Sequence, residues 1–276
     1  MDRNQRRPAE AAWQRVYSDV AKGVRFYSRI PLPALPFEAD PHGLPDFRAV
    51  APVLPLAAVV IAVLPALVLA ATLRLGLGAW LSAALTVAVL TLVTGAFHED
   101  GLADTADGFG GGGTRERRLE IMRDSLIGSF GASALVLAFF LRIGGLATLA
   151  ERLAPVQAAL VVVIVAALSR TAGLIPMTLL PPARMDGAAY AVGQPSRRSL
   201  LAGTALTTAI AVPLGLIARL PLSGITLMLA SSALAGLILT RLSHRLIGGH
   251  TGDVAGAVQQ IAEVGGLVAL LLAVEP

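Results

Sequence analysis

The chain has 276 residues, of which 55% are hydrophobic and only 14% are charged. Soluble domains carry about a quarter charged residues, so this composition excludes an ordinary soluble protein and indicates a polytopic membrane protein. The formal net charge of +4 is spread over several short loops. That spread favours contact with anionic lipid over nucleic-acid binding. Cysteine is absent, which excludes disulfides and thiolate chemistry.

Residues 1–48 are predicted to form an N-terminal segment ahead of the membrane-spanning part. They are polar and basic, and no apolar core of a signal peptide lies among them. Apolar residues recur at helical spacing between Trp13 and Val24, so residues 1–25 can form a helix on the membrane surface. A partly ordered basic tail is the alternative. Two prolines at 31 and 33 then favour an extended segment.

Apolar segments of about 20 residues are long enough to cross a membrane as helices. Six such spans are predicted, over residues 49–73, 76–97, 126–147, 155–180, 200–220 and 222–240. A seventh apolar run, 264–274, is short and spans only if it includes residues 254–263. We therefore predict an all-α integral membrane bundle of six to seven transmembrane helices. Residues 49–276 form its catalytic domain.

The positions of Lys and Arg predict the side on which each loop lies. The N-terminal segment and the loops 98–125, 181–199 and 241–263 hold 8, 4, 3 and 2 Lys or Arg residues. The opposite loops hold Arg74, Arg142 with Arg152, and Arg219. The positive-inside rule then places the N-terminus and the three motif-bearing loops in the cytoplasm.

The most informative stretch is residues 98–108, HEDGLADTADG, at the end of the second predicted span. If this stretch is helical, Asp100, Asp104 and Asp107 lie within roughly 60° of arc at 3.6 residues per turn. Three carboxylates on one stripe repel each other strongly unless a cation lies among them. Oxygen ligands select Mg²⁺, Mn²⁺ or Ca²⁺ over zinc. A merely solvated stripe is a poor alternative, because unpaired charge near hydrocarbon is costly.

A glycine run and a basic segment follow the acidic stretch. Residues 110–113 are all glycine and can wrap a phosphate or form a mobile loop. Arg118 and Arg123 suit phosphate oxygens, because the guanidinium fork binds bidentately, and Asp124 can complete a metal shell. For Arg115–Arg117 a solvated loop is the better interpretation. The combination is typical of an enzyme that handles a pyrophosphate substrate at the membrane surface.

A second polar island covers residues 248–256, where a glycine-rich turn leads into a helix. Asp253 either caps that helix or contributes to the site. Glu263 lies on the same general face and opens the last apolar run. Arg170 lies inside the fourth span, where it either snorkels or pairs with a carboxylate of the site.

Taken together, these motifs resemble the cobalamin synthase family, the adenosylcobinamide-GDP ribazoletransferases. The resemblance rests on FYSRIP at 26–31, on the acidic stretch, on LEIMRDSLIG at 119–128 and on GHTGD at 249–253. These stretches occur in the family's order and cover the chain nearly end to end. The family often has threonine where Ser28 stands, and the run of four glycines is longer than its pattern.

The resemblance implies a late step of cobalamin biosynthesis in the bacterial inner membrane. Adenosylcobinamide-GDP and α-ribazole, or α-ribazole 5′-phosphate, give adenosylcobalamin, or its 5′-phosphate, and GMP. Mg²⁺ is the implied cofactor, held by Asp100, Asp104, Asp107 and Asp124. Asp104 also counts as catalytic, with His98 as the first candidate base and Glu99 as the second. The candidate substrate and phosphate contacts are Arg29, Arg118, Arg123, Ser125, Arg170, Asp253 and Glu263.

Two other functions remain open from the sequence. An ion-coupled transporter also uses acidic residues in the membrane, but its sites usually lie near the midplane of inverted repeats, and no repeat is evident here. A CDP-alcohol phosphotransferase-like lipid synthase has an analogous aspartate pattern and would release CMP instead of GMP. The expected partners are the two substrates and membrane lipids. A homo-oligomer is left open, and no nucleic acid is expected.

Overall fold

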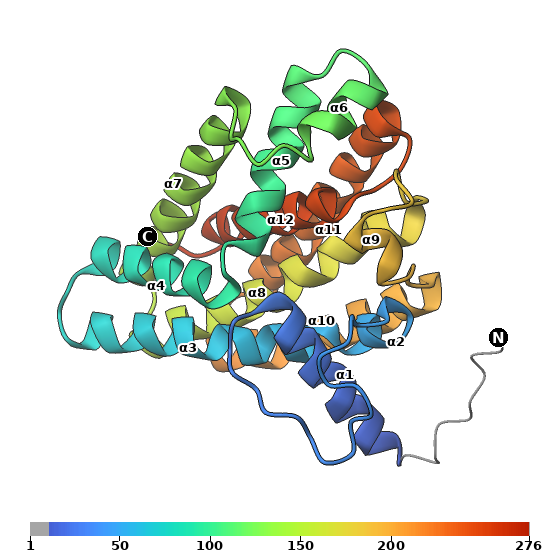
Figure 1. Cartoon of the computed structure of the whole chain (residues 1–276). Helices are drawn as coiled ribbons and strands as arrows, with labels where there is room; N and C mark the ends of the chain where they lie inside the picture. Colours follow the sequence, from blue (N-terminus) through green and yellow to red (C-terminus); the bar gives the residue numbers. More distant parts are fainter. Residues whose placement is uncertain (1–10, 276) are drawn as a thin grey trace.

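The computed structural model describes residues 11–275, which are folded into helices, so the predicted all-α class is confirmed (Figure 1). Arg3, Arg6 and Arg7 of the predicted N-terminal helix lie outside the described residues. The elements are α1 (Ala12–Tyr27), α2 (Phe47–Val50), η1 (Ala51–Val53), α3 (Leu54–Arg74), α4 (Ala79–Thr94), α5 (Phe97–Gly111), α6 (Arg115–Ile121), α7 (Ser129–Arg152), α8 (Pro155–Leu179), α9 (Ala188–Ala191), α10 (Arg197–Ile217), α11 (Leu222–Ile247) and α12 (Gly252–Leu271).

Six of these helical segments are long and apolar enough to cross a membrane. They are Phe47–Arg74, which joins α2, η1 and α3, and then α7, α8, α10, α11 and α12. The polytopic membrane class is thereby confirmed. The prediction of six to seven spans also holds, because α4 and α5 together pass the same test as one bent span.

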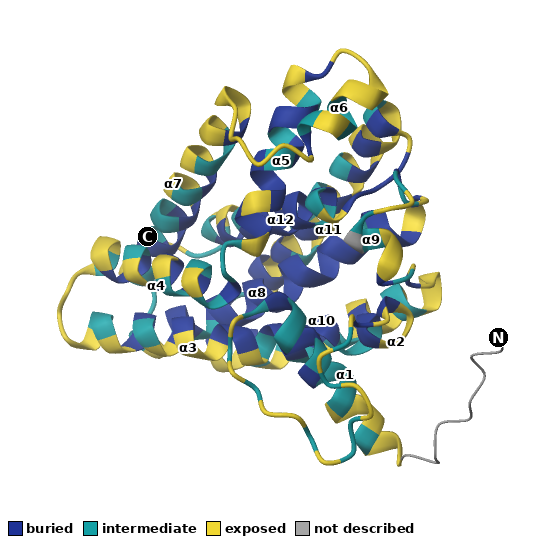
Figure 2. Ribbon diagram, viewed as in Figure 1, coloured by how far each residue is buried: buried dark blue, intermediate teal, exposed yellow. Residues whose placement is uncertain are grey.

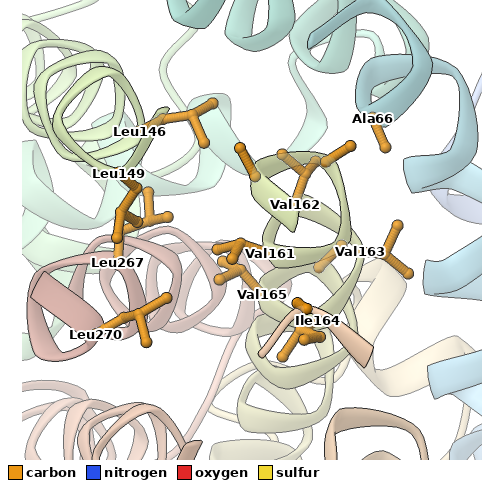
Figure 3. Close-up of a cluster of buried hydrophobic side chains, with 14 of the residues drawn as sticks. Ala66, Leu146, Leu149, Val161, Val162, Val163, Ile164, Val165, Leu267 and Leu270 are labelled. Atoms are coloured by element: carbon orange, nitrogen blue, oxygen red, sulfur yellow. The ribbon is translucent and has the colours of Figure 1, made fainter. Parts of the chain in front are cut away.

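Helix α8 is the centre of the bundle. The most apolar 18-residue stretch of α8 is 89% buried, whereas the corresponding stretch of α10 is 22% buried. Its sequence is apolar all round and rich in Val and Ala, as expected for a helix that has neighbours on every side. Leu149 of α7 and Leu270 of α12 lie on the side of α8 that carries Val161 and Val165, and Ala66 of α3 lies on the side of Val162 and Val163 (Figure 3). At the periphery the situation is the opposite: Figure 2 shows many exposed residues along α7. Large hydrophobic side chains are exposed on both α7 and α10, which suits contact with lipid.

The second predicted span is wrong as a single straight helix. Helix α4 ends at Thr94, where Gly95 and Ala96 both adopt the left-handed conformation, with φ of 65° and 58°. A left-handed residue ends a helix, and α5 then leaves at 89° to α4. The FYSRIP segment supports this bend, because the backbone N–H of Arg29 donates to the Val93 carbonyl oxygen at 2.7 Å. The Arg29 side chain also covers Gly95.

Two of the predicted loops are largely helical. Residues 98–125 contain most of α5 and all of α6, so the acidic stretch is helical, as its aspartate spacing suggested. The loop predicted over 241–263 is reduced to residues 248–251, because α11 continues to Ile247 and α12 begins at Gly252. The last apolar run joins residues 254–263 in α12, and this helix is long and apolar enough to span a membrane. Within residues 181–199 the helical parts are the single turn of α9 and the start of α10.

Helices α5 and α12 lie side by side and approach closely through glycine (Figure 1). A Cβ atom on Gly101 would lie 2.8 Å from the backbone carbonyl oxygen of Asp253. On the other helix, a Cβ on Gly256 would lie 3.4 Å from the Cα of His98. Small residues permit this backbone contact, as is common between membrane helices. The contact sets the position of the acidic helix on the bundle.

We expect Gly101→Ala to destabilise the protein by about 1–3 kcal/mol, because the new methyl group overlaps backbone that cannot turn aside. Thermal unfolding of the detergent-solubilised protein measures the effect. The matched control is Gly113→Ala, since a Cβ at Gly113 meets nothing within 4 Å. Equal melting temperatures for the two variants would contradict the packing described here.

Candidate active site on helix α5

The aspartate stripe occupies one face of α5, as the spacing predicted. Asp100 is exposed, Asp104 is half-buried and Asp107 is buried, so the stripe descends from the surface into the protein. Asp253 of α12 adds a fourth carboxylate, since Asp104 feels the charges of Asp100, Asp253 and Asp107. Arg184 of the 181–199 loop balances part of this charge through an ion pair with Asp253 at 3.2 Å.

Asp107 holds the start of α7. Its two carboxylate oxygens accept the backbone N–H groups of Gly128 at 2.7 Å and Gly131 at 2.9 Å. A carboxylate at this position satisfies unpaired donors and interacts favourably with the positive end of the helix dipole. Both glycines are needed, because a Cβ at either position would collide with the Asp107 side chain. Asp107 therefore has a structural role, and both of its oxygens are already engaged before any metal ion binds.

The other predicted metal ligands are not gathered around one point. Asp124 is exposed, and its carboxylate accepts the backbone N–H of Leu126 at 3.1 Å. Residues 11–275 contain no group of three or more His, Asp or Glu side chains arranged to hold a metal ion. Asp100 and Asp104 differ from Asp107, because their carboxylates make no hydrogen bond within the described part of the chain. These two are the carboxylates left available for a cation.

A buried charge network lies directly behind the stripe. Arg142 of α7 is 1% exposed and donates to Glu99 of α5 and to Glu263 of α12, each at 2.8 Å. Arg170 of α8 is also buried and interacts electrostatically with both glutamates. Gln259 donates to the second oxygen of Glu263 at 3.0 Å. Two arginines and two glutamates thus balance each other and join four helices in the apolar interior.

His98 and Arg170 face away from the stripe. Residues two positions apart in an α-helix are rotated by about 200° around its axis, so His98 and Asp100 project from nearly opposite sides of α5. The imidazole is buried and stacks on the Tyr27 ring, with 5.3 Å between centroids and 12° between planes. Arg170 donates only its Nη1, to the Ala166 carbonyl oxygen at 3.3 Å, and its Nε and Nη2 are buried without a hydrogen-bond partner in the described chain.

The predicted phosphate-binding residues differ in exposure: Arg118 is half-buried, and the other three lie at the surface. Arg123 forms an exposed ion pair with Asp186 at 2.6 Å. Arg118 donates to the Leu246 carbonyl oxygen at 3.3 Å. Ser125 and Arg29 are exposed. None of these four contacts the aspartate stripe through a hydrogen bond within residues 11–275, whereas Asp253 lies beside it.

Comparison with known proteins gives the family. The sequence profile described as "Cobalamin-5-phosphate synthase" matches residues 19–271. The chain belongs to this family. A relative from Azorhizobium caulinodans, named adenosylcobinamide-GDP ribazoletransferase, is 49% identical over 267 residues, which cover 95% of this chain and 98% of the relative. Relatives of the same name from Xanthobacter autotrophicus and Sinorhizobium medicae are 45% and 44% identical, each covering 94% of this chain and 97% of the relative. No solved structure matches.

Several residues of this family member's site escape sequence reasoning. Arg142 was counted with an outer loop, but it lies well inside α7 and is fully paired. Its position within a predicted span was the available signal, because an ionisable residue in a membrane helix is by default functional or paired. The sequence did not single out Arg184 as a site residue, because it lies in a generally polar loop. Arg115, interpreted as solvated, braces α6 by donating to the carbonyl oxygens of Ile247 at 2.9 Å and Ala183 at 2.7 Å.

We expect Arg142→Met to destabilise the protein by about 3–5 kcal/mol, because it leaves Glu99 and Glu263 buried with only one arginine to balance them. The melting temperature should fall by about 10 °C. The control is Arg74→Met at the exposed end of α3, which removes the same charge without breaking a buried pair. An Arg142→Met protein as stable as the control would show that the network contributes nothing to stability.

Proposed function

We propose that this membrane transferase joins adenosylcobinamide-GDP to α-ribazole, or to α-ribazole 5′-phosphate, with release of GMP. The observation that carries the proposal is the carboxylate face shared by α5 and α12, with Arg184 beside it. Membership of the family and the printed name of the relatives support the same reaction. Neither a transporter nor a CDP-alcohol lipid synthase finds support in these matches.

The reaction exchanges one phosphate ester partner for another. A ribose hydroxyl other than the 5′-hydroxyl forms a bond to the cobinamide-side phosphorus, because the 5′-oxygen of α-ribazole 5′-phosphate is already esterified and stays so in the product. The bond from that phosphorus to the oxygen of GMP breaks. The hydroxyl proton goes to a base, and the negative charge that leaves with GMP has to be neutralised. The carboxylate face alone cannot supply that neutralisation, because it is itself negative.

Mg²⁺ fits the oxygen donors of this face. This ion is usually held by one or two carboxylates together with substrate phosphates and water. Asp100 and Asp104 supply two carboxylates free of other hydrogen bonds, while Asp107 is engaged by α7. Asp100 and Asp104 would hold the ion, and its positive charge would neutralise the negative charge that develops on the leaving GMP. Arg184 is placed to contact phosphate from the Asp253 side.

His98 is the better of the two candidate bases. Glu99 is committed to its ion pair with Arg142. The ring of His98 forms no hydrogen bond with a described residue. It projects from the side of α5 that packs against Tyr27 of α1. A base role for His98 therefore requires the ribose hydroxyl to approach from that side.

We propose that the site faces the cytoplasm across a bacterial inner membrane. If each span crosses once, the polar links 112–128, 180–196 and 248–251 lie on one side, and the short links 75–78, 153–154 and 218–221 lie on the other. In Figure 1 the α3–α4 link and the C-terminus lie on the left, and α2 and α9 on the right. The positive-inside rule favours a cytoplasmic position for the first set. Exposed Trp13 and Tyr17 on the basic helix α1 suit contact with the membrane surface.

Asp104→Asn should lower kcat for GMP release by at least about 100-fold, because the neutral amide weakens cation binding where charge develops. The measurement is GMP release from adenosylcobinamide-GDP with α-ribazole and Mg²⁺. The control is Glu151→Gln, which removes one negative charge at the far end of α7. Near-normal turnover of Asp104→Asn would overturn the assignment of this carboxylate.

The absence of native cysteine permits a direct test of orientation. Single-cysteine variants Gly113→Cys, before α6, and Leu77→Cys, in the α3–α4 link, are expressed in bacteria and treated with a membrane-impermeant maleimide. We expect labelling of Leu77→Cys in spheroplasts and of Gly113→Cys only after the cells are opened. The reverse pattern would invert the proposed topology.

A further inference from the structure

A pocket lined by aromatic rings lies at the start of α5, on the side where His98 projects. The rings belong to Phe26 and Tyr27 of α1, Phe47 of α2, and Phe97 and His98 of α5. We call it the aromatic pocket. It encloses about 500 Å³ of space, part of it open to solvent. Neither the reaction chemistry nor the cation site accounts for it.

The rings are arranged to receive another ring. Phe26 meets Tyr27, Phe47 and Phe97 edge to face, with centroids 4.9, 5.6 and 5.5 Å apart. Tyr27 and His98 are parallel. A pocket bordered by ring faces and ring edges at right angles favours a planar aromatic ligand, which gains from offset-stacked and edge-to-face contacts at the same time. An aliphatic ligand would gain only from burial.

Arg170 supplies the polar group of the pocket. It lines the pocket, it is 3% exposed, and its Nε and Nη2 have no hydrogen-bond partner in the described chain. Buried donors without partners are costly, so a ligand that brings an acceptor is favoured. The charge of Arg170 is already balanced within the network that contains Glu99, Glu263 and Arg142. The ligand therefore has to supply a lone pair, and a negative charge is not required.

The aromatic pocket leads toward the carboxylate face. Gly252 and Ala189 line both this pocket and a smaller polar cavity, whose other walls include Arg184, His250 and Asp253. Asp253 in turn lies within electrostatic range of Asp100 and Asp104. A ligand with its ring in the aromatic pocket can thus extend a polar substituent toward the aspartates.

We propose that the aromatic pocket binds the neutral nitrogen heterocycle of the nucleoside acceptor, and that Arg170 donates to the unsubstituted ring nitrogen. The inference rests on the proposed function, and it assigns the acceptor's ring to the His98 side of α5. The pyrophosphate of the other substrate is left for the aspartate side. This arrangement brings the ribose hydroxyl past His98, which is the approach that a base role for this residue requires.

The experiment measures binding of α-ribazole alone to the full-length protein in detergent, through the intrinsic fluorescence of the benzimidazole ring. Phe97→Leu keeps the bulk and removes the ring, so Kd should rise about fivefold, and Phe97→Tyr should restore it. Arg170→Lys keeps the charge and removes the fork, so Kd should rise about tenfold. The control is Phe140→Ala, an exposed ring on α7 outside the pocket, for which Kd should not change.

The following outcomes distinguish a wrong assignment of the pocket from a wrong proposed function. If Arg170 instead held a phosphate, Arg170→Lys would weaken binding of α-ribazole 5′-phosphate and leave that of α-ribazole unchanged, which would overturn the proposal. Unchanged Kd in Phe97→Leu would overturn it as well, and this variant decides the matter if Arg170→Lys fails to fold. Failure of the wild-type protein to release GMP would refute the proposed function, and the binding result would stand apart from it.

Discussion

The structure depends on one buried charge network in an otherwise apolar bundle. Arg142 clamps Glu99 and Glu263, while Arg170 completes the balance of charge. Removing charges from water is expensive, so such a network rarely adds net stability over a well-packed apolar core. We infer that its value is specificity of position, because separating α5, α7 and α12 would leave Glu99, Arg142 or Glu263 buried without its partner. Glu99 immediately precedes Asp100, so the network also fixes where the aspartate stripe begins.

Helix α5 separates two kinds of chemistry onto two faces. One face carries Asp100, Asp104 and Asp107 beside Asp253 of α12. The other face carries His98 against Tyr27 and borders the aromatic pocket, with Arg170 at its wall. The sharp bend after α4 turns the axis of α5 by 89°, which brings α5 against α12. A ligand lying across the start of α5 can reach both faces.

Much of this arrangement is predictable from the sequence, because hydrophobic runs report spans and a three- or four-residue spacing reports a helix face. The stripe on α5 is one such case. The bend is less predictable: Gly95 is an ordinary helix end, but Ala96 in the left-handed conformation has no signature in the sequence. The prediction of a loop over residues 241–263 was wrong for a different reason. Glu263 and Gln259 look too polar for a membrane helix until Arg142, over a hundred residues earlier, pairs with Glu263.

The same limit applies to the site. Spacing along one helix could bring Asp100 and Asp104 together, but only tertiary structure shows that Asp107 is occupied by the start of α7 and that Arg184 reaches Asp253. The role of the basic segment was hard to predict, because an arginine that can bind phosphate can equally donate to backbone carbonyl oxygens. Arg115 donates to the carbonyl oxygen of Ile247 in this way. Composition gives the type of ligand that a segment can bind, whereas the partner is decided by the fold.

The most direct test of the account is a GMP-release assay of the wild-type protein reconstituted in liposomes. Adenosylcobinamide-GDP is supplied with and without α-ribazole and with and without Mg²⁺. The account predicts that GMP forms in step with adenosylcobalamin only when both additions are present. Undiminished turnover without Mg²⁺, or absence of GMP with all components present, would contradict it.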